Sequence, residues 1–208
     1  MSDARKYAVV IFDCDGVMFD SKQANIRFYN HLLARFNRPG MNAEEINFCH
    51  QHTADESIRR IFKGTPYMDE ALAYRLKVDY APFLEDMIIE PDLKDVLEIL
   101  KGKYGLAVAT NRSNTIQQVL EIFGLKAYFE MVVSSLDVEK PKPHPESIYK
   151  ILRFFGASAR EALYVGDSGV DQQTARSAGT VFVAYKNETL DADFHVDRLM
   201  EVTSILSG

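Results

Sequence analysis

Cysteine is scarce in this sequence, long apolar runs are missing, and positive charge is in deficit. The 208 residues include 24 Lys and Arg against 30 Asp and Glu, which gives a formal net charge of −6. This balance argues against nucleic acid or an anionic membrane surface as the main partner. No apolar run approaches the roughly 20 residues of a membrane span. We therefore expect a globular protein without a nucleic-acid or membrane partner.

The two cysteines, Cys14 and Cys49, lie in unrelated segments and form no metal-type pair. The first residues, MSDARKYAVV, lead into an apolar run without the apolar segment and small-residue cleavage site of a signal peptide. These features predict a cytoplasmic protein in a reducing compartment.

Short apolar runs alternate with longer segments of helical periodicity from Lys6 onward. The runs are β-branched or apolar almost throughout, as strands buried on both faces must be. They predict strands at residues 7–12, 106–110, 131–134, 163–165 and 180–184. Strand–helix–strand alternation of this kind predicts an α/β fold, with a Rossmann-like parallel sheet and helices on both faces.

One long segment interrupts this alternation. Residues 13–105 separate the first two predicted strands, far more than one crossover helix needs. The part from 21 to 85 contains several helical patterns and no convincing strand. We therefore expect a small all-helical cap domain at 21–85, inserted into an α/β core domain formed by residues 1–20 and 86–208.

Polar residues gather where the predicted strands end. Ligands of open parallel sheets bind beyond the carboxyl ends of the strands, so groups from separate strand ends are expected to face one site. Thr110 and Asn111 stand at the start of a predicted helix. Lys140 and Lys142 stand on a proline-spaced loop. The groups, in chain order, are Asp13 and Asp15; Thr110 and Asn111; Lys140 and Lys142; Asp167 and Asp171.

These residue types suit phosphoryl transfer. Asp13, Asp15 and Asp167 are hard oxygen ligands of the kind that Mg²⁺ prefers, and the ion would offset their repulsion and neutralise a substrate phosphate. A carboxylate can also act as the nucleophile and form an aspartyl-phosphate. In an extended segment, a second carboxylate two residues further on projects to the same side about 6.6 Å away, which leaves room for a phosphoryl group.

Two further groups would bind the phosphate itself. Thr110 and the amides after it can bind phosphate oxygens as a helix N-terminus does. A lysine on the proline-stiffened loop would add a positive charge, and the residue types alone do not decide between Lys140 and Lys142.

The stretches FDCDGVMFDS, VATN, KPHPESI and GDSGVDQQTARSAG follow one another at the predicted strand ends. In this order they resemble the four motifs of the haloacid dehalogenase superfamily, in its phosphoglycolate-phosphatase and β-phosphoglucomutase-like branch with a helical cap. The resemblance covers nearly the whole chain. It implies a Mg²⁺-dependent enzyme acting on a small phosphorylated metabolite, as a monomer or homodimer.

The resemblance also implies roles for the acidic residues. Asp13 would be the nucleophile and a metal ligand. Asp15 would be the general acid/base, and its backbone carbonyl would also touch the metal. Asp167 would ligate Mg²⁺, and Asp171 would support the ion through water.

The remaining motifs imply the phosphate contacts. Thr110 and Asn111 would bind the substrate phosphate. The third-motif pattern of lysine, proline, any residue, proline and acid favours Lys142 over Lys140, because Glu146 then takes the acidic place.

The pattern favours hydrolysis of a phosphoglycolate- or sugar-phosphate-like phosphomonoester. The dehalogenases of the superfamily lack a second carboxylate, and this chain has Asp15. Mutases of this branch carry a histidine soon after the hinge and an arginine in the cap; Asn25 and Ala54 stand near those places here. A phosphosugar mutase is the alternative. A non-catalytic phosphate- or metal-binding regulator is a further one, less favoured because the four motif groups are intact.

Some residues of the helical segment invite a functional interpretation that we do not favour. Arg59, Arg60 and Lys63 could meet an anionic part of the substrate, but a solvated helix face is the simpler explanation. His50 and His52 suggest a metal site, but positions two apart on a helix do not face each other.

Overall fold

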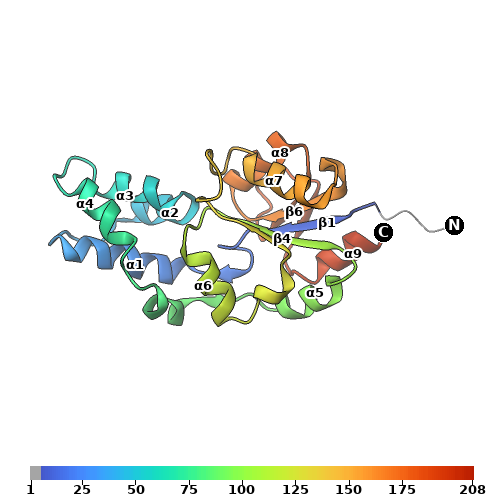
Figure 1. The fold of residues 1–208 in the computed structure, drawn as a ribbon, viewed down its shortest axis with the longest axis horizontal. Helices are drawn as coiled ribbons and strands as arrows, with labels where there is room; N and C mark the ends of the chain where they lie inside the picture. The colour runs from blue at the N-terminus through green and yellow to red at the C-terminus, as the bar shows by residue number, and fades with distance from the viewer. Residues whose placement is uncertain (1–5) are drawn as a thin grey trace.

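The computed structural model describes residues 6–208, and in these residues a six-stranded sheet forms the centre of the molecule (Figure 1). The strand order is β5-β4-β1-β6-β7-β8, and all neighbouring strands are parallel. The predicted α/β class with a parallel sheet is therefore confirmed. The strands are β1 (Val9–Phe12), β4 (Gly105–Ala109), β5 (Met131–Val133), β6 (Ala162–Gly166), β7 (Val181–Tyr185) and β8 (Phe194–Val196).

Both faces of the sheet are covered by helices, which explains why all its strands except the edge strand β8, with His195, are apolar throughout. In β1, Val10 and Phe12 join one buried cluster while Val9 and Ile11 join another, because successive side chains point to opposite faces. In Figure 1, α7 (Glu146–Phe155) and α8 (Gly169–Ala178) lie above the sheet. The helices α5 (Leu93–Leu100), α6 (Thr115–Ile122) and α9 (Glu201–Ser207) lie below it.

A small antiparallel ribbon lies between the sheet and the helical segment. It pairs β2 (Phe19–Asp20) with β3 (Ile88–Ile89), and Glu90 N–H continues the pairing by donating to Met18 O at 3.0 Å. The sequence pattern predicts no strand at either place. The ribbon brings together the chain that enters the helical segment and the chain that leaves it.

The segment predicted to be all-helical forms four α-helices and a short 3₁₀-helix, and it lies at the end of the molecule away from the C-terminus (Figure 1). Capping boxes at Asn42 and Thr53 begin the second and third helices. Residues 68–87 do not form one continuous helix, because α4 ends at Arg75 and a 3₁₀-helix begins at Ala81. The elements are α1 (Lys22–Arg35), α2 (Ala43–Gln51), α3 (Ala54–Ile61), α4 (Met68–Arg75) and η1 (Ala81–Asp86).

The division into a core domain (1–20 and 86–208) and a cap domain (21–85) stays a prediction. Residues 1–5 of the predicted core domain lie outside the described residues. Two more 3₁₀ turns, η2 (Lys126–Tyr128) and η3 (Ala159–Glu161), complete the described elements. Within residues 6–208, no helix combines the length and apolarity that crossing a membrane requires.

Helix α5 offers a direct test of the packing against the sheet. Leu97 of α5 is fully buried in the larger apolar cluster. We expect Leu97→Ala to lower the free energy of unfolding by about 2–5 kcal/mol, because it removes buried methyl groups and leaves a cavity. Lys94→Ala, on the exposed side of the same helix, should change it by less than about 0.5 kcal/mol. Equal effects of the two substitutions in urea denaturation would contradict this packing.

Candidate active site

A cleft lies beyond the carboxyl ends of the central strands, where the helical segment faces the sheet. Its empty space, counted out to the solvent-open mouth, is about 790 Å³. The structure brings six of the predicted site residues into this cleft and places Asp171, which is fully buried, directly behind it. The six lining residues are Asp13, Asp15, Thr110, Asn111, Lys142 and Asp167.

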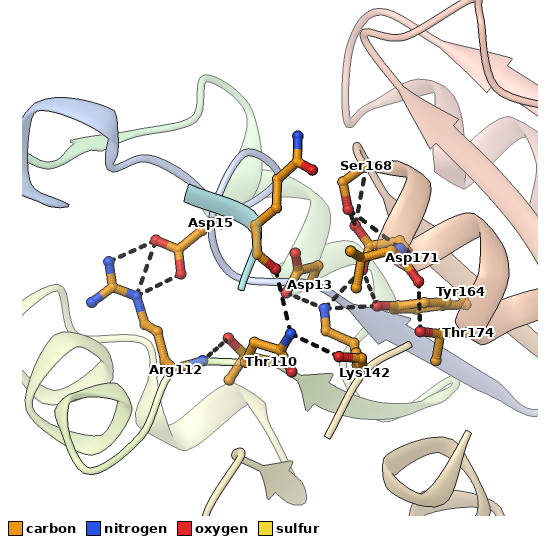
Figure 2. A network of polar contacts seen from close by, with 12 residues as sticks. Asp13, Asp15, Thr110, Arg112, Lys142, Tyr164, Ser168, Asp171 and Thr174 are labelled. Carbon is orange, nitrogen blue, oxygen red and sulfur yellow. Dashed lines mark hydrogen bonds and ion pairs between the residues drawn. The ribbon is translucent and has the colours of Figure 1, made fainter. Parts of the chain in front are cut away.

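Lys142 is the centre of the polar network (Figure 2). Its Nζ lies 2.8 Å from Asp13 Oδ1 and 2.7 Å from Asp171 Oδ1, and it donates to the Tyr164 hydroxyl at 3.0 Å. Its side chain is only 3% exposed. The alternative lysine, Lys140, is exposed, and its backbone N–H donates to Glu146. Lys142 is therefore the lysine that the structure places beside the carboxylates.

The pKa values follow from this burial and pairing. Burial alone would lower the pKa of Lys142, but the Asp13 and Asp171 carboxylates outweigh it and raise the pKa well above its usual value. Burial raises the pKa of Asp13 well above its usual value, although Lys142 opposes the shift. Asp171 differs: burial would raise its pKa, but Lys142 lowers it below the usual value. Asp171 is thus the firmly ionised partner of the ammonium.

Asp171 is ionised because several donors converge on it (Figure 2). The Tyr164 hydroxyl donates to Oδ1 at 2.5 Å, and Ser168 donates to Oδ2 from its hydroxyl at 2.6 Å and its backbone N–H at 3.2 Å. Ser168 and Asp171 also form the capping box of α8. The start of α8 therefore fixes Asp171, and Asp171 holds Lys142 against Asp13.

Three carboxylates lie close enough to share one cation. Oxygens of Asp13, Asp167 and Asp171 all lie within 4.8 Å of one another. Burial and the nearby Asp171 raise the pKa of Asp167 to about 7, as expected for clustered carboxylates with too little positive charge beside them. An oxygen-only donor set of this kind fits a hard divalent cation. The Asp15 carboxylate does not belong to this cluster. The sequence motifs lead us to expect the backbone carbonyl of Asp15, and not its carboxylate, to touch the metal, so that prediction is not affected.

Gly16 allows Asp167 to come this close to the first strand end. Its φ is +84°, and a Cβ at this position would lie 2.1 Å from Asp167 Oδ2. Only glycine meets both conditions without displacing the carboxylate.

The Asp15 carboxylate forms an ion pair with Arg112 instead (Figure 2). Arg112 donates from Nε to Oδ2 at 2.8 Å and from an Nη to Oδ1 at 2.6 Å, and the Ser21 hydroxyl donates to Oδ1 as well. The buried guanidinium also lies 5.3 Å from the centroid of the Tyr80 ring. Burial would raise the pKa of Asp15, but Arg112 lowers it below the usual value. Asp15 is therefore ionised in this arrangement.

Arg112 is a site residue that the sequence motifs do not predict. The signal for it in the sequence is its position two residues after Thr110, in a stretch assigned to the site. The Arg112 N–H donates to Thr110 Oγ1 at 3.0 Å, so both side chains belong to one turn. The expectation that Thr110 and Asn111 start a helix is wrong, because α6 begins only at Thr115.

Asn111 links the strand end to two other parts of the cleft. Its Nδ2 donates to the backbone oxygen of Lys142 at 3.1 Å and to that of Gln51, at the end of α2, at 3.4 Å. The predicted phosphate-binding residues thus lie beside Lys142 and beneath the helical segment.

Among the described lysines and arginines of the helical segment, one lines the cleft, and it is not one of those singled out from the sequence. Arg59, Arg60 and Lys63 are exposed and do not line the cleft, as the solvated-face interpretation predicts. Arg75, at the end of α4, lines the cleft and is 8% exposed. Although position 54 is an alanine, the helical segment therefore still supplies an arginine to the cleft, from position 75.

A parallel α/β enzyme with acidic and basic groups at its strand ends is thus the class that fold and cleft define. The sequence model described as haloacid dehalogenase-like hydrolase matches residues 10–185. A crystal structure of a haloacid dehalogenase-superfamily hydrolase, subfamily IA, variant 1, from Geobacter sulfurreducens is 39% identical, with a TM-score of 0.85 over 96% of this chain and 99% of that one. The chain belongs to the haloacid dehalogenase-like hydrolase family, and the resemblance is confirmed.

Two other relatives carry more specific descriptions. A protein of Bacillus cereus (strain AH820) named pyrophosphatase PpaX is 27% identical over 217 residues, which is 97% of each chain. The crystal structure of a predicted phosphoglycolate phosphatase from Haemophilus somnus has a TM-score of 0.83 and 23% identity, covering 97% of this chain and 99% of that one. At that identity the second likeness concerns the fold alone.

The two lysines of the third motif permit a matched test of the network. Lys142→Met would leave the buried Asp13 and Asp171 without their counter-charge, and we expect it to lower the free energy of unfolding by about 3–5 kcal/mol in metal-free buffer. Lys140→Met removes the same charge from the surface and should change it by less than about 0.5 kcal/mol. Similar urea midpoints for the two variants would refute the described role of Lys142.

Proposed function

We propose that the protein is a phosphatase that hydrolyses a small phosphomonoester through an aspartyl-phosphate on Asp13. The observation that carries the proposal is the position of Asp13 in the cleft, paired with buried Lys142 at 2.8 Å and followed two residues later by a second carboxylate. A nucleophile, a fixed cation and a candidate acid/base group then lie around one place where a phosphoryl group would bind.

The reaction has two steps. In the first, an oxygen of Asp13 attacks phosphorus, the bond from phosphorus to the leaving oxygen breaks, and Asp15 gives that oxygen a proton. In the second, Asp15 takes a proton from water, the water oxygen attacks phosphorus, and the bond to Asp13 breaks. Phosphate leaves, and both carboxyl groups return to their starting states.

The ion pair between Asp15 and Arg112 bears on this cycle. Donors occupy both oxygens of Asp15: Arg112 contacts both, and Ser21 contacts Oδ1. Oδ2 accepts a hydrogen bond from Arg112 Nε alone, so a site for a proton remains on it, but the guanidinium lowers the pKa of Asp15 and disfavours its protonated form. Movement of the Arg112 side chain away from Asp15 would therefore favour the protonated form that the first step needs.

Other residues bind and orient the substrate. Thr110 and Asn111 would hold phosphate oxygens, and Lys142 would offset their charge while it keeps Asp13 in place. Asp13, Asp167 and the backbone carbonyl of Asp15 would hold Mg²⁺, with Asp171 supporting it through water. The ion would neutralise charge on the phosphoryl group.

The comparisons favour hydrolysis of a small phosphate compound. One relative is named pyrophosphatase and another is described as a predicted phosphoglycolate phosphatase. One observation keeps the phosphosugar mutase as a second candidate: Arg75 supplies an arginine from the helical segment to the cleft, where a mutase would need to hold a second phosphate.

Phosphate release is the first test. With a panel of phosphomonoesters and pyrophosphate, we expect release that needs a divalent cation and falls by about 10³-fold or more in Asp13→Asn. Asp95→Asn makes the same chemical change at an exposed position of α5 and should leave the rate unchanged. Release that persists in Asp13→Asn would overturn the proposal, and isomerisation of a sugar phosphate without release would favour the mutase.

Metal binding can be measured without turnover. A ligand that binds only the folded state stabilises it by about 2.7 kcal/mol at a hundred times its Kd, so Mg²⁺ should raise the Tm of the native protein. Asp167→Asn removes one of the clustered carboxylates, and we expect it to lose most of this shift. An equal Mg²⁺-induced shift in Asp167→Asn would show that the ion binds elsewhere.

A further inference from the structure

Arg75 is a buried cation whose hydrogen-bonding capacity is largely unused. Its side chain is 7% exposed, and its Nε is buried without a hydrogen-bond partner in the described residues. One Nη donates to Asp55, and the other reaches only Ser113 Oγ at 3.4 Å. Buried polar groups are normally satisfied, so this guanidinium has the features of a site that a ligand completes.

We infer that Arg75 binds a second oxyanion of the substrate, a carboxylate or a phosphate, at the end away from the reacting phosphate. The inference rests on the proposed function and narrows the substrate class to small phosphomonoesters with a second anionic group. It makes Arg75 a specificity residue of the cleft.

The counter-ion of Arg75 lies on the side away from the cleft. The side chain of Asp55 is 54% exposed, and Asp55 lines a separate shallow hollow with Ser135, Leu136 and Pro141. Asp55 does not line the cleft, whereas Arg75 lines both spaces. An anion in the cleft can therefore approach Arg75 without displacing Asp55.

The other lysine and arginine of the cleft are paired with carboxylates that line the cleft or lie directly behind it, unlike Arg75, whose partner Asp55 lies outside it. Lys142 lies between Asp13 and Asp171, and Arg112 is bonded to Asp15. Among the described residues that line the cleft, the remaining lysine or arginine is Arg75. A second anionic group on a substrate would find its strongest unused donors there.

The helical side of the cleft offers no competing negative charge. The described residues that line the cleft from the helical segment include no Asp or Glu, and its lining carboxylates are all at strand ends. A substrate with two anionic groups fits this separation, with its reacting phosphate near the proposed metal site and its second anion near Arg75.

The contact with Ser113 connects this subsite to the phosphate end. Ser113 lies in the same turn as Thr110 and Arg112, between β4 and α6. Arg75 therefore lies one turn of chain away from the residues proposed to bind the reacting phosphate, which is compatible with a substrate of only a few carbons.

Matched substrates test the inference. We would measure kcat/KM for carboxyalkyl phosphates of two to four carbons and for hydroxyalkyl phosphates of the same lengths, together with the corresponding alkyl bisphosphates. The native protein should prefer a dianionic member over the alcohol by about tenfold or more. Arg75→Gln should reduce this preference by about 10- to 100-fold, mainly through KM, because it removes a charge-assisted hydrogen bond.

Two further variants complete the design. Arg75→Lys keeps the charge without the planar fork and should restore part of the preference. Arg59→Gln removes an exposed cation of α3 outside the cleft and should leave the preference unchanged. The inference would be overturned if Arg75→Gln kept the full preference for dianionic substrates over the hydroxyalkyl phosphates. It would also be overturned if the native protein showed no such preference.

Binding separates this inference from the proposed function. If no phosphomonoester is hydrolysed, the proposed function fails, and calorimetry with non-hydrolysable phosphonates in the presence of Mg²⁺ still decides the role of Arg75. The native protein should bind 3-phosphonopropionate about tenfold or more tightly than 3-hydroxypropylphosphonate, and Arg75→Gln should lose this difference. Equal binding of the two phosphonates by the native protein would contradict the inference.

Discussion

The site depends on one buried ammonium group, that of Lys142, held between two carboxylates. Without it, Asp13 and Asp171 would face each other across a water-poor space, and such uncompensated charges are strongly destabilising. The position of Lys142 depends in turn on Asp171, which the start of α8 and the Tyr164 hydroxyl fix by hydrogen bonds. The fold therefore specifies where Asp13 lies through a chain of contacts that runs from β6 and α8.

The charges of the cleft remain unbalanced after these contacts. Four carboxylates (Asp13, Asp15, Asp167 and Asp171) face two cations, Lys142 and Arg112. The two excess negative charges are what a divalent cation would offset, and burial together with the nearby Asp171 carboxylate raises the pKa of Asp167. The helical side has the opposite character, because Arg75 is a cation with unused donors. This polarity underlies both the proposed metal site and the proposed second anion subsite.

Much of this arrangement is predictable from sequence, for a simple reason. Continuous apolar runs end abruptly at polar residues, and parallel strands bring those ends to one edge, so the cleft and most of its core-side residues follow from the pattern. Elements that form by pairing between distant parts of the chain cannot be predicted from such a local pattern. The β2–β3 ribbon pairs Phe19 with Ile89, and its two-residue strands carry no periodic signal. Arg75 carries no such signal either. In the sequence it is one of several cations of a helical segment, and the folded position of α4 brings it to the cleft.

The central claim is that Asp13 becomes covalently phosphorylated during turnover. Rapid quenching during the first turnover, followed by mass spectrometry of the peptide that contains Asp13, tests it directly. The account predicts a phosphate adduct on that peptide, which hydroxylamine converts to a hydroxamate at Asp13. Full turnover with no adduct on Asp13, or an adduct on another residue, would contradict it.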